Sequence, residues 1–190
     1  HVSYVDTSTN DLKYARCSSM CGNPASWTYV TVDSAANVLS ERTGIAVDAS
    51  NVVHISYHDA TPVNVKYARC GAACTAAASW SLSTITSPGT GGSYSSIAAG
   101  PGGVLHLTYD STAGLIYLQC SAGAACTNPL NWTSVAADAG ANRGFHNSRV
   151  VEPSGAVHVA YYISSSGDLK YARCTTGCTP TCRLEPCSSS

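Results

Sequence analysis

Charged side chains are scarce in this sequence. Only 11% of its 190 residues are Asp, Glu, Lys or Arg, against about a quarter in an ordinary soluble domain. The ten positive and eleven negative residues leave a formal net charge of −1, and the positive ones are scattered along the chain. We therefore expect neither a basic surface for nucleic acid nor one for an anionic membrane.

Long apolar runs and the residues that favour helices are also rare. No apolar run approaches the roughly 18 residues that a membrane helix needs, so no membrane insertion is expected. Met and Phe occur once each, whereas Gly and Tyr occur 16 and 11 times. This composition favours short strands and turns over helices, and it predicts an all-β protein.

One segment recurs four times along the chain. It begins with His and ends with Tyr, and its copies are His1 to Tyr4, His54 to Tyr57, His106 to Tyr109 and His158 to Tyr161. The copies start 53, 52 and 52 residues apart. A repeat period of roughly 50 residues is typical of β-propellers, in which each repeat forms one sheet or blade.

Each unit contains three further runs that are rich in β-branched and aromatic residues. One ends at a cysteine: Leu12 to Cys17, Val65 to Cys70, Ile116 to Cys120 and Leu169 to Cys174. Another begins at a tryptophan in the first three units, and the last precedes the next histidine. Clusters of turn residues separate the runs, which predicts four antiparallel strands per unit.

These boundaries predict one repeat domain over residues 1–178. It comprises a partial unit at 1–40, whole units at 41–92 and 93–144, a partial unit at 145–178, and a cysteine-containing tail at 179–190. Alternation within the second unit places Ile55 and Tyr57 on one strand face and His54 and Ser56 on the other, as expected for a blade covered on both sides. A β-sandwich of regularly spaced strands is the alternative fold.

The pattern S-x-I-A-V-D-x-x-G-x-V-H-I-S-Y-x-D, followed by L-K-Y-A-R-C, resembles the repeats of large secreted bacterial proteins that are predicted to form propellers. The likeness covers residues 1–178. It implies a β-propeller of four-stranded blades in a secreted bacterial protein, but it implies no shared activity. Propellers with Asp-box repeats are similar in architecture alone, because their S-x-D-x-G-x-x-W signature is absent here.

Ten cysteines are too many for a reducing compartment unless they bind metal or do redox work. The third pair has five intervening residues where the others have three, and a disulfide tolerates such an insertion better than a zinc site does. We therefore expect local disulfides, with zinc as the alternative, and an extracellular location in the secreted fraction or at the cell surface. The predicted pairs are Cys17 with Cys21, Cys70 with Cys74, Cys120 with Cys126, Cys174 with Cys178, and Cys182 with Cys187.

The repeated histidines are expected to serve the fold, because a residue that recurs at one strand position in every unit serves the unit. Residues that stand in a single unit are better candidates for an asymmetric site. These are Glu41, Arg42, His58, Arg143, His146, Arg149 and Glu152. The densest polar cluster, from Arg143 to Arg149, is expected to be a loop that leads into a strand. No catalytic motif, cofactor or metal site is predicted. Our candidate binding residues are Trp27, Trp80, Trp132, Arg143, His146 and Arg149.

A binding module is the leading functional hypothesis, with glycans as the ligands, because Tyr, Trp, Asn, Asp and Arg supply the stacking faces and planar hydrogen bonds that sugars need. The alternative is a structural or adhesive segment of a larger surface protein, in which the repeats stiffen and extend the chain. The expected partners are glycans or surface proteins. A propeller-type polysaccharide lyase or glycosidase comes third. We further expect that three-stranded units at both ends require further copies, or missing parts of the same chain, to complete the assembly.

Overall fold

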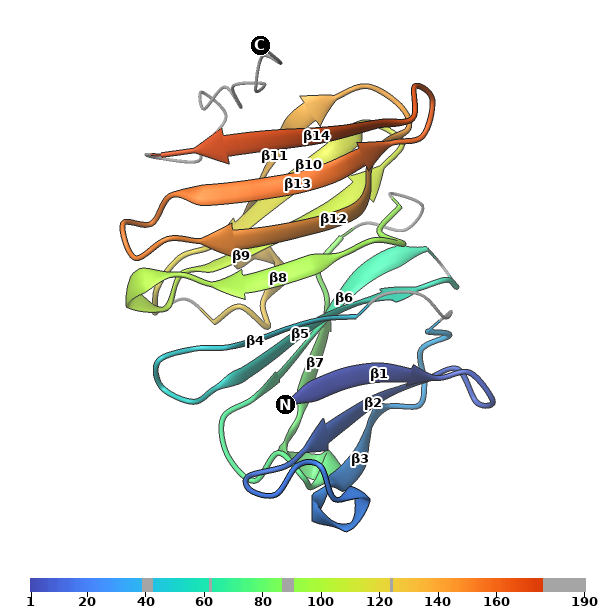
Figure 1. Cartoon of the computed structure of the whole chain (residues 1–190), viewed down its shortest axis with the longest axis vertical. Coiled ribbons are helices and arrows are strands. Elements are labelled where there is room, and N and C mark those ends of the chain that lie inside the picture. Colours follow the sequence, from blue (N-terminus) through green and yellow to red (C-terminus); the bar gives the residue numbers. More distant parts are fainter. Residues whose placement is uncertain (39–42, 62, 87–90, 124, 176–190) are drawn as a thin grey trace.

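The protein is described from a computed structural model, which covers residues 1–38, 43–61, 63–86, 91–123 and 125–175. In these residues the chain forms four antiparallel sheets, which follow one another along the molecule in sequence order (Figure 1). Strands within a sheet also pair in chain order, so every connection within a sheet is a hairpin. The all-β fold with three-stranded end sheets and four-stranded middle sheets is as predicted.

The strands have the following bounds. The first sheet contains β1 (Val2–Asp6), β2 (Asp11–Arg16) and β3 (Thr28–Asp33). The second contains β4 (Gly44–Val47), β5 (Val53–Asp59), β6 (Asn64–Cys70) and β7 (Ser81–Thr84). The third contains β8 (Ser96–Ala99), β9 (Leu105–Ser111), β10 (Gly114–Cys120) and β11 (Trp132–Ala139). The fourth contains β12 (Arg143–Val151), β13 (Val157–Ile163) and β14 (Asp168–Cys174).

Four one-turn 3₁₀ helices complete the described elements: η1 (Pro24–Ser26), η2 (Ala77–Ser79), η3 (Pro101–Gly103) and η4 (Pro129–Asn131). No helix among the described residues is long and apolar enough to cross a membrane.

One prediction about the fourth unit was wrong. The segment from Arg143 to Asn147 was expected to be a loop, but it forms the first half of β12, which starts two residues before the predicted unit boundary at 145. Pairing with β13 stabilises it, and two register shifts in that ladder, on either side of Phe145, absorb its irregular sequence. Such bulges let a strand bend without leaving its sheet.

The sheets pack face to face, and three separate apolar cores lie between successive pairs. The first core joins Leu12 and Tyr14 of the first sheet to Ile55 and Tyr57 of the second. The second and third cores repeat this arrangement at the next two junctions. Every residue of β5 is buried, because this strand is covered on both sides. Its alternation is as predicted, since Ile55 packs toward the first sheet whereas the Ser56 hydroxyl meets Ser95 of the third-sheet segment.

Polar contacts also recur between sheets. A hydroxyl from the His-to-Tyr segment of one unit meets a polar side chain that precedes the first strand of the next unit or lies in it. Their distances are 2.7 Å for Ser3 and Thr43, 3.1 Å for Ser56 and Ser95, and 2.6 Å for Thr108 and Asn147. At the second junction Gly44 permits close approach, because a Cβ there would lie 2.8 Å from the Ile97 nitrogen.

The outer faces of the end sheets differ from their internal counterparts. Leu169 is 80% exposed, whereas the equivalent Leu12, Val65 and Leu115 are each 0% exposed under the following sheet. At the other end Val2 is 41% exposed, whereas its equivalents Ile55, Leu107 and Val159 are at most 2% exposed. Each end face is therefore one half of the junction that packs the interior, and no other sheet among the described residues covers it.

Three of the predicted disulfides are present. The bridges Cys17–Cys21 and Cys70–Cys74 have Cα–Cα distances of 5.7 Å, and Cys120–Cys126 spans 5.9 Å. Cys178, Cys182 and Cys187 lie outside the described residues, and with them the last two predicted pairs. Three disulfides within one small chain indicate an oxidising compartment.

Candidate functional site

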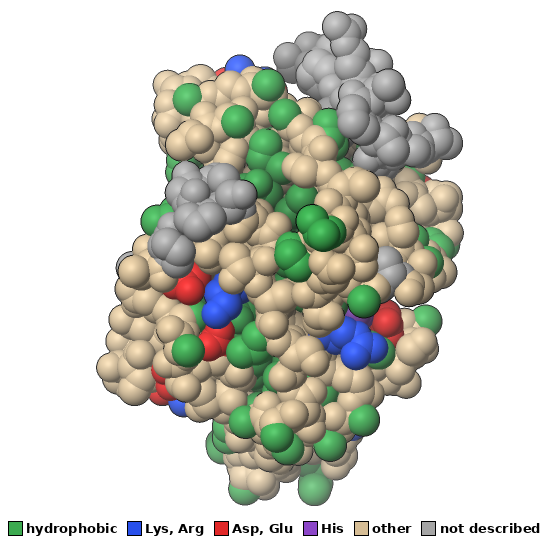
Figure 2. Space-filling view, turned by 180° about the vertical axis from the view of Figure 1, so that it is seen from behind, with side chains coloured by type: hydrophobic (Ala, Val, Ile, Leu, Met, Phe, Trp, Pro, Cys, Tyr) green, Lys and Arg blue, Asp and Glu red, His purple; other side chains and the backbone are tan. Residues whose placement is uncertain are grey.

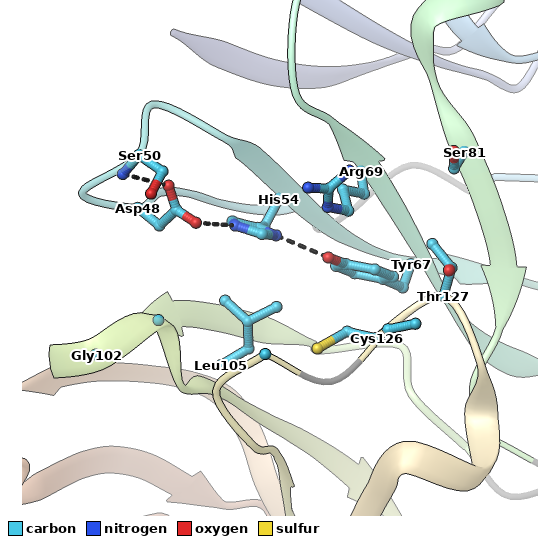
Figure 3. A pocket seen from close by; sticks show the side chains of 13 residues that line it. Asp48, Ser50, His54, Tyr67, Arg69, Ser81, Gly102, Leu105, Cys126 and Thr127 are labelled. Atoms are coloured by element: carbon cyan, nitrogen blue, oxygen red, sulfur yellow. Dashed lines mark hydrogen bonds and ion pairs between the residues drawn. The ribbon is translucent and has the colours of Figure 1, made fainter.

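A cleft of about 490 Å³ opens between the second and third sheets. Figure 3 shows its two walls: Asp48, His54 and Tyr67 lie in a row on the second sheet, and Leu105 and Cys126 face them from the third-sheet side. The remaining lining residues are Ser50, Arg69, Ser81, Gly102, Gly103, Gly123, Ala125 and Thr127. Polar side chains from one sheet thus face a wall made largely of backbone and small residues.

The turn between β4 and β5 fixes the carboxylate of the cleft. Asp48 Oδ1 accepts hydrogen bonds from the backbone N–H groups of Ser50 and Val52, at 2.8 and 2.9 Å. Burial alone would raise the pKa of Asp48, but these N–H groups and the His54 imidazole outweigh burial, and the pKa is lowered. Asp48 is therefore an anchored, ionised group whose oxygens already have partners.

A hydrogen-bonded chain runs from this carboxylate into the sheet. Asp48 Oδ2 lies 3.2 Å from His54 Nε2, and His54 Nδ1 lies 2.7 Å from the Tyr67 hydroxyl. Because a carboxylate can only accept, Nε2 carries the hydrogen and Nδ1 accepts from Tyr67 in the neutral ring. Burial lowers the pKa of His54, against the opposing effect of Asp48. Burial also raises the pKa of Tyr67 well above its ordinary value. The chain fixes one wall of the cleft in a single geometry.

Proton transfer is not the role that this chain of groups favours. Tyr67 is fully buried and His54 is 4% exposed, so neither reacting atom faces a bound molecule freely. The same His and Tyr contact recurs at 2.6 to 2.7 Å in the other three units. A contact shared by every unit holds the unit together, as was predicted for the histidines.

Arg69 is the cationic group of the cleft. It lies opposite His54 in the ladder of β5 and β6, and its side chain is exposed. Among the described residues no carboxylate lies within ion-pair distance of it. A guanidinium with a free planar edge can donate two parallel hydrogen bonds to a ligand.

Two features make this junction unlike the others. The Cys120–Cys126 loop is two residues longer than its counterparts, and it brings Gly123 and Thr127 to the cleft. The turn before β9 contains Gly102 and Gly103, and a Cβ on either would meet nothing within 4 Å. Both features were visible in the sequence as departures from the repeat, but only the packing of the sheets brings them together.

The predicted tryptophans lie elsewhere. Trp80 and Trp132 are buried, and they contact the rings of Tyr14 and Tyr67 edge to face at 5.1 and 5.6 Å. Trp27 is half-buried, since no sheet precedes it here. The three indole N–H groups donate to the carbonyls of Cys21, Cys74 and Cys126. These contacts link each cysteine loop to its strand and leave little of Trp80 and Trp132 for a ligand.

The other three predicted residues lie along β12 and do not line the cleft. Arg143 pairs with Asp138, and Arg149 is inserted against the third sheet, where it donates to Ser96 O and Thr108 Oγ1. His146 is exposed at a φ of 51°, and its ring centre lies 4.5 Å from that of Tyr94. The sequence analysis placed these three residues in one cluster, and they do lie together along β12. It did not predict the cleft. Glu41 and Arg42 lie outside the described residues.

The face of the molecule opposite to the view of Figure 1 carries little charge. Figure 2 shows a face dominated by uncharged polar side chains and backbone, with apolar side chains scattered over it and charged groups in a few small clusters of mixed sign.

Comparisons with protein-family models and with curated proteins found no match to this chain.

Proposed function

We propose that this chain is part of an extracellular binding module whose cleft between the second and third sheets binds a glycan. The observation that carries the proposal is the cleft itself. It combines an anchored carboxylate, hydroxyl groups and an exposed guanidinium that has no carboxylate partner among the described residues. Sugars are recognised by such fixed planar hydrogen-bonding groups, and the locked Asp48, His54 and Tyr67 give the cleft a preformed wall.

The four sheets are proposed to be blades of a β-propeller. Three observations support this: each sheet is a simple meander, successive sheets pack face to face, and the two end faces are uncovered copies of the internal junction. A sandwich would close its core between two sheets rather than stack four in series. Secretion, or display on a bacterial surface, is proposed on the basis of the disulfides.

A panel of immobilised bacterial and plant polysaccharides tests the function. We expect wild-type protein to bind at least one class, and Thr127→Trp, which fills the cleft, to weaken binding tenfold or more. Arg69→Gln is expected to weaken binding similarly, since a charge-assisted hydrogen bond contributes about 1.5 to 3 kcal/mol. Arg173→Gln is the matched control, because Arg173 occupies the same strand position in the fourth unit but lies outside the cleft.

A structural segment of a larger surface protein is the second candidate. The repeated His–Tyr and Trp–carbonyl contacts favour it, because they show that the most regular residues serve packing. Binding of no polysaccharide class at millimolar concentrations, by a protein that is folded and disulfide-bonded, would favour this candidate over the first.

A further inference from the structure

The cleft between the second and third sheets contains two side chains of opposite charge that do not pair with each other. Asp48 and Arg69 both line it. The carboxylate is held by the N–H groups of its own turn and by His54, and Arg69 takes no part in holding it. The cleft therefore presents a hydrogen-bond acceptor and a separate cationic donor, and a ligand that satisfies both must carry both an O–H group and an acceptor.

The fourth unit shows the same two positions paired. Glu152 and Arg173 are the equivalents of Asp48 and Arg69: each acid stands six residues before the repeated histidine, and each arginine lies opposite that histidine in its ladder. Arg173 Nη2 lies 4.0 Å from Glu152 Oε1. Asp48 is one methylene shorter than Glu152 and is tied to its turn, so Arg69 lacks the counter-charge that Arg173 has.

The third unit lacks both charges. Gly100 and Gln119 stand there in place of the acid and the arginine. Among the three units in which both positions are described, the acid and the arginine are thus present together or absent together. The second unit alone among these three has both without an ion pair between them, and it is the unit whose charged side chains line the cleft. The charge of Arg69 is therefore available to a ligand.

The opposite wall leaves room for a sugar ring. Gly102, Gly103 and Gly123 line it, and a Cβ on any of the three would meet no atom within 4 Å. Glycine lets a ligand approach the backbone closely. The cleft volume of about 490 Å³ lies within the roughly 300 to 1,000 Å³ that is typical of ligand pockets.

Asp48 can accept one more hydrogen bond. A carboxylate has about four acceptor positions. The N–H groups of Ser50 and Val52 occupy two at Oδ1, and His54 Nε2 occupies one at Oδ2. The remaining position at Oδ2 suits a sugar O–H group, because a second carboxylate would be repelled there.

We propose that the ligand of this cleft is an acidic glycan, in which the carboxylate of a uronic acid or another sugar acid binds the Arg69 guanidinium and a hydroxyl group donates to Asp48. This inference rests on the proposed glycan-binding function and names the class of glycan. A guanidinium binds a carboxylate through two parallel N–H bonds, which a neutral sugar cannot match in strength. The opposite charges of Arg69 and Asp48 also set the direction of the sugar, with its acid group at Arg69.

Matched pairs of polysaccharides test the proposal. Polygalacturonate, alginate and hyaluronan are each compared with the same polymer after its carboxyl groups have been reduced to primary alcohols, which keeps the sugar rings and removes the charge. We expect at least one acidic polymer to bind roughly tenfold or more tightly than its reduced form. Sodium chloride is expected to narrow this difference, because the exposed guanidinium is screened by salt.

Three variants locate the preference. Arg69→Gln is expected to bind the acidic and the reduced polymer equally. Asp48→Glu is expected to narrow the preference, because a glutamate at this position reaches the arginine in the fourth unit. Arg173→Gln is the control that keeps the full preference, since Arg173 lies outside the cleft.

The outcomes separate this inference from the function on which it rests. Equal binding of acidic and reduced polymers by the wild type would overturn the inference and leave the glycan-binding proposal intact. A preference that persists in Arg69→Gln would also overturn it. Binding of poly-glutamate as tightly as of any acidic polysaccharide would overturn it too, because the ligand would then be an acidic polypeptide. If no polysaccharide binds in either form, the proposed function fails and the inference fails with it.

Discussion

One histidine position has three different surroundings in this chain. His54 and His158 bond a carboxylate, His106 Nε2 lies beside Gly100 without a hydrogen-bond partner among the described residues, and His1 bonds the Tyr14 hydroxyl. The shared part is the bond from Nδ1 to a tyrosine hydroxyl, which holds adjacent strands of a sheet. The variable part is the Nε2 partner, which is a carboxylate in the second and fourth units.

The lowered pKa of a buried histidine predicts that the folded protein loses stability as the pH falls. Burial lowers the pKa of His54 below its ordinary 6.5, so the unfolded chain binds the proton more tightly than the folded one. The stability contributed by neutral His54 is complete above pH 6.5, and it declines as the pH falls from there toward the folded pKa. Each unit of lowering corresponds to about 1.4 kcal/mol.

Urea unfolding at pH 7.5, 6.5, 5.5 and 4.5 measures this effect. We expect wild type to lose stability below pH 6.5 and His54→Gln to lose less over the same interval. Parallel curves for the two proteins would show that His54 does not titrate differently on folding. His158→Gln is a useful comparison, because the carboxylate partner is the same in kind while the side chain is more exposed.

Two positions that face each other across a junction differ together from one repeat to the next. At the first junction Asp33, which is 3% exposed, accepts hydrogen bonds from Tyr57 and Lys66 at 2.7 and 2.6 Å. At the second junction Thr86 and Ile116 occupy the positions of Asp33 and Lys66. The acid and the base are thus present together or absent together, as expected when a buried charge requires its partner.

This pairing can be tested by exchanging one junction's residues for those of the other. Lys66→Ile alone is expected to destabilise the protein by about 3 to 5 kcal/mol, because it leaves the buried Asp33 carboxylate without a cation. The double variant with Asp33→Thr is expected to recover most of that loss. Chemical denaturation of the two single variants and the double variant gives the coupling energy. Additive effects would contradict the interpretation.

The described residues form a series of similar sheets, and no other described sheet covers the two end faces. Leu169 at one end, and Val2 and Tyr4 at the other, are exposed where their internal equivalents are buried. These two faces are the complementary halves of one repeated junction. We expect each face to be covered by a sheet of a further copy of the chain.

Light scattering on the purified 190-residue chain measures this association. We expect concentration-dependent association that Leu169→Lys weakens, because a charge in the packing face is costly to bury. Leu130→Lys is the control, since Leu130 is 88% exposed but lies in η4, away from both end faces. A chain that stays monomeric at all concentrations would contradict the expectation.

The sequence by itself determined the features that form between residues close together along the chain. The period of the His-to-Tyr segments predicted four sheets, alternation predicted the two faces of β5, and cysteine spacing predicted the local disulfides, because hairpins and short loops are local. It misjudged the segment from Arg143 to Asn147, where pairing with β13 overrides a loop-like composition.

Only the tertiary structure determined the site. The cleft combines Asp48 and Arg69 of one unit with Gly102 and Thr127 of the next. Such combinations form between sheets, roughly one repeat apart, and which faces meet is set by burial of apolar side chains rather than by local pattern. The departures from the repeat were visible in the sequence, but their meaning depended on which residues the packing places opposite them.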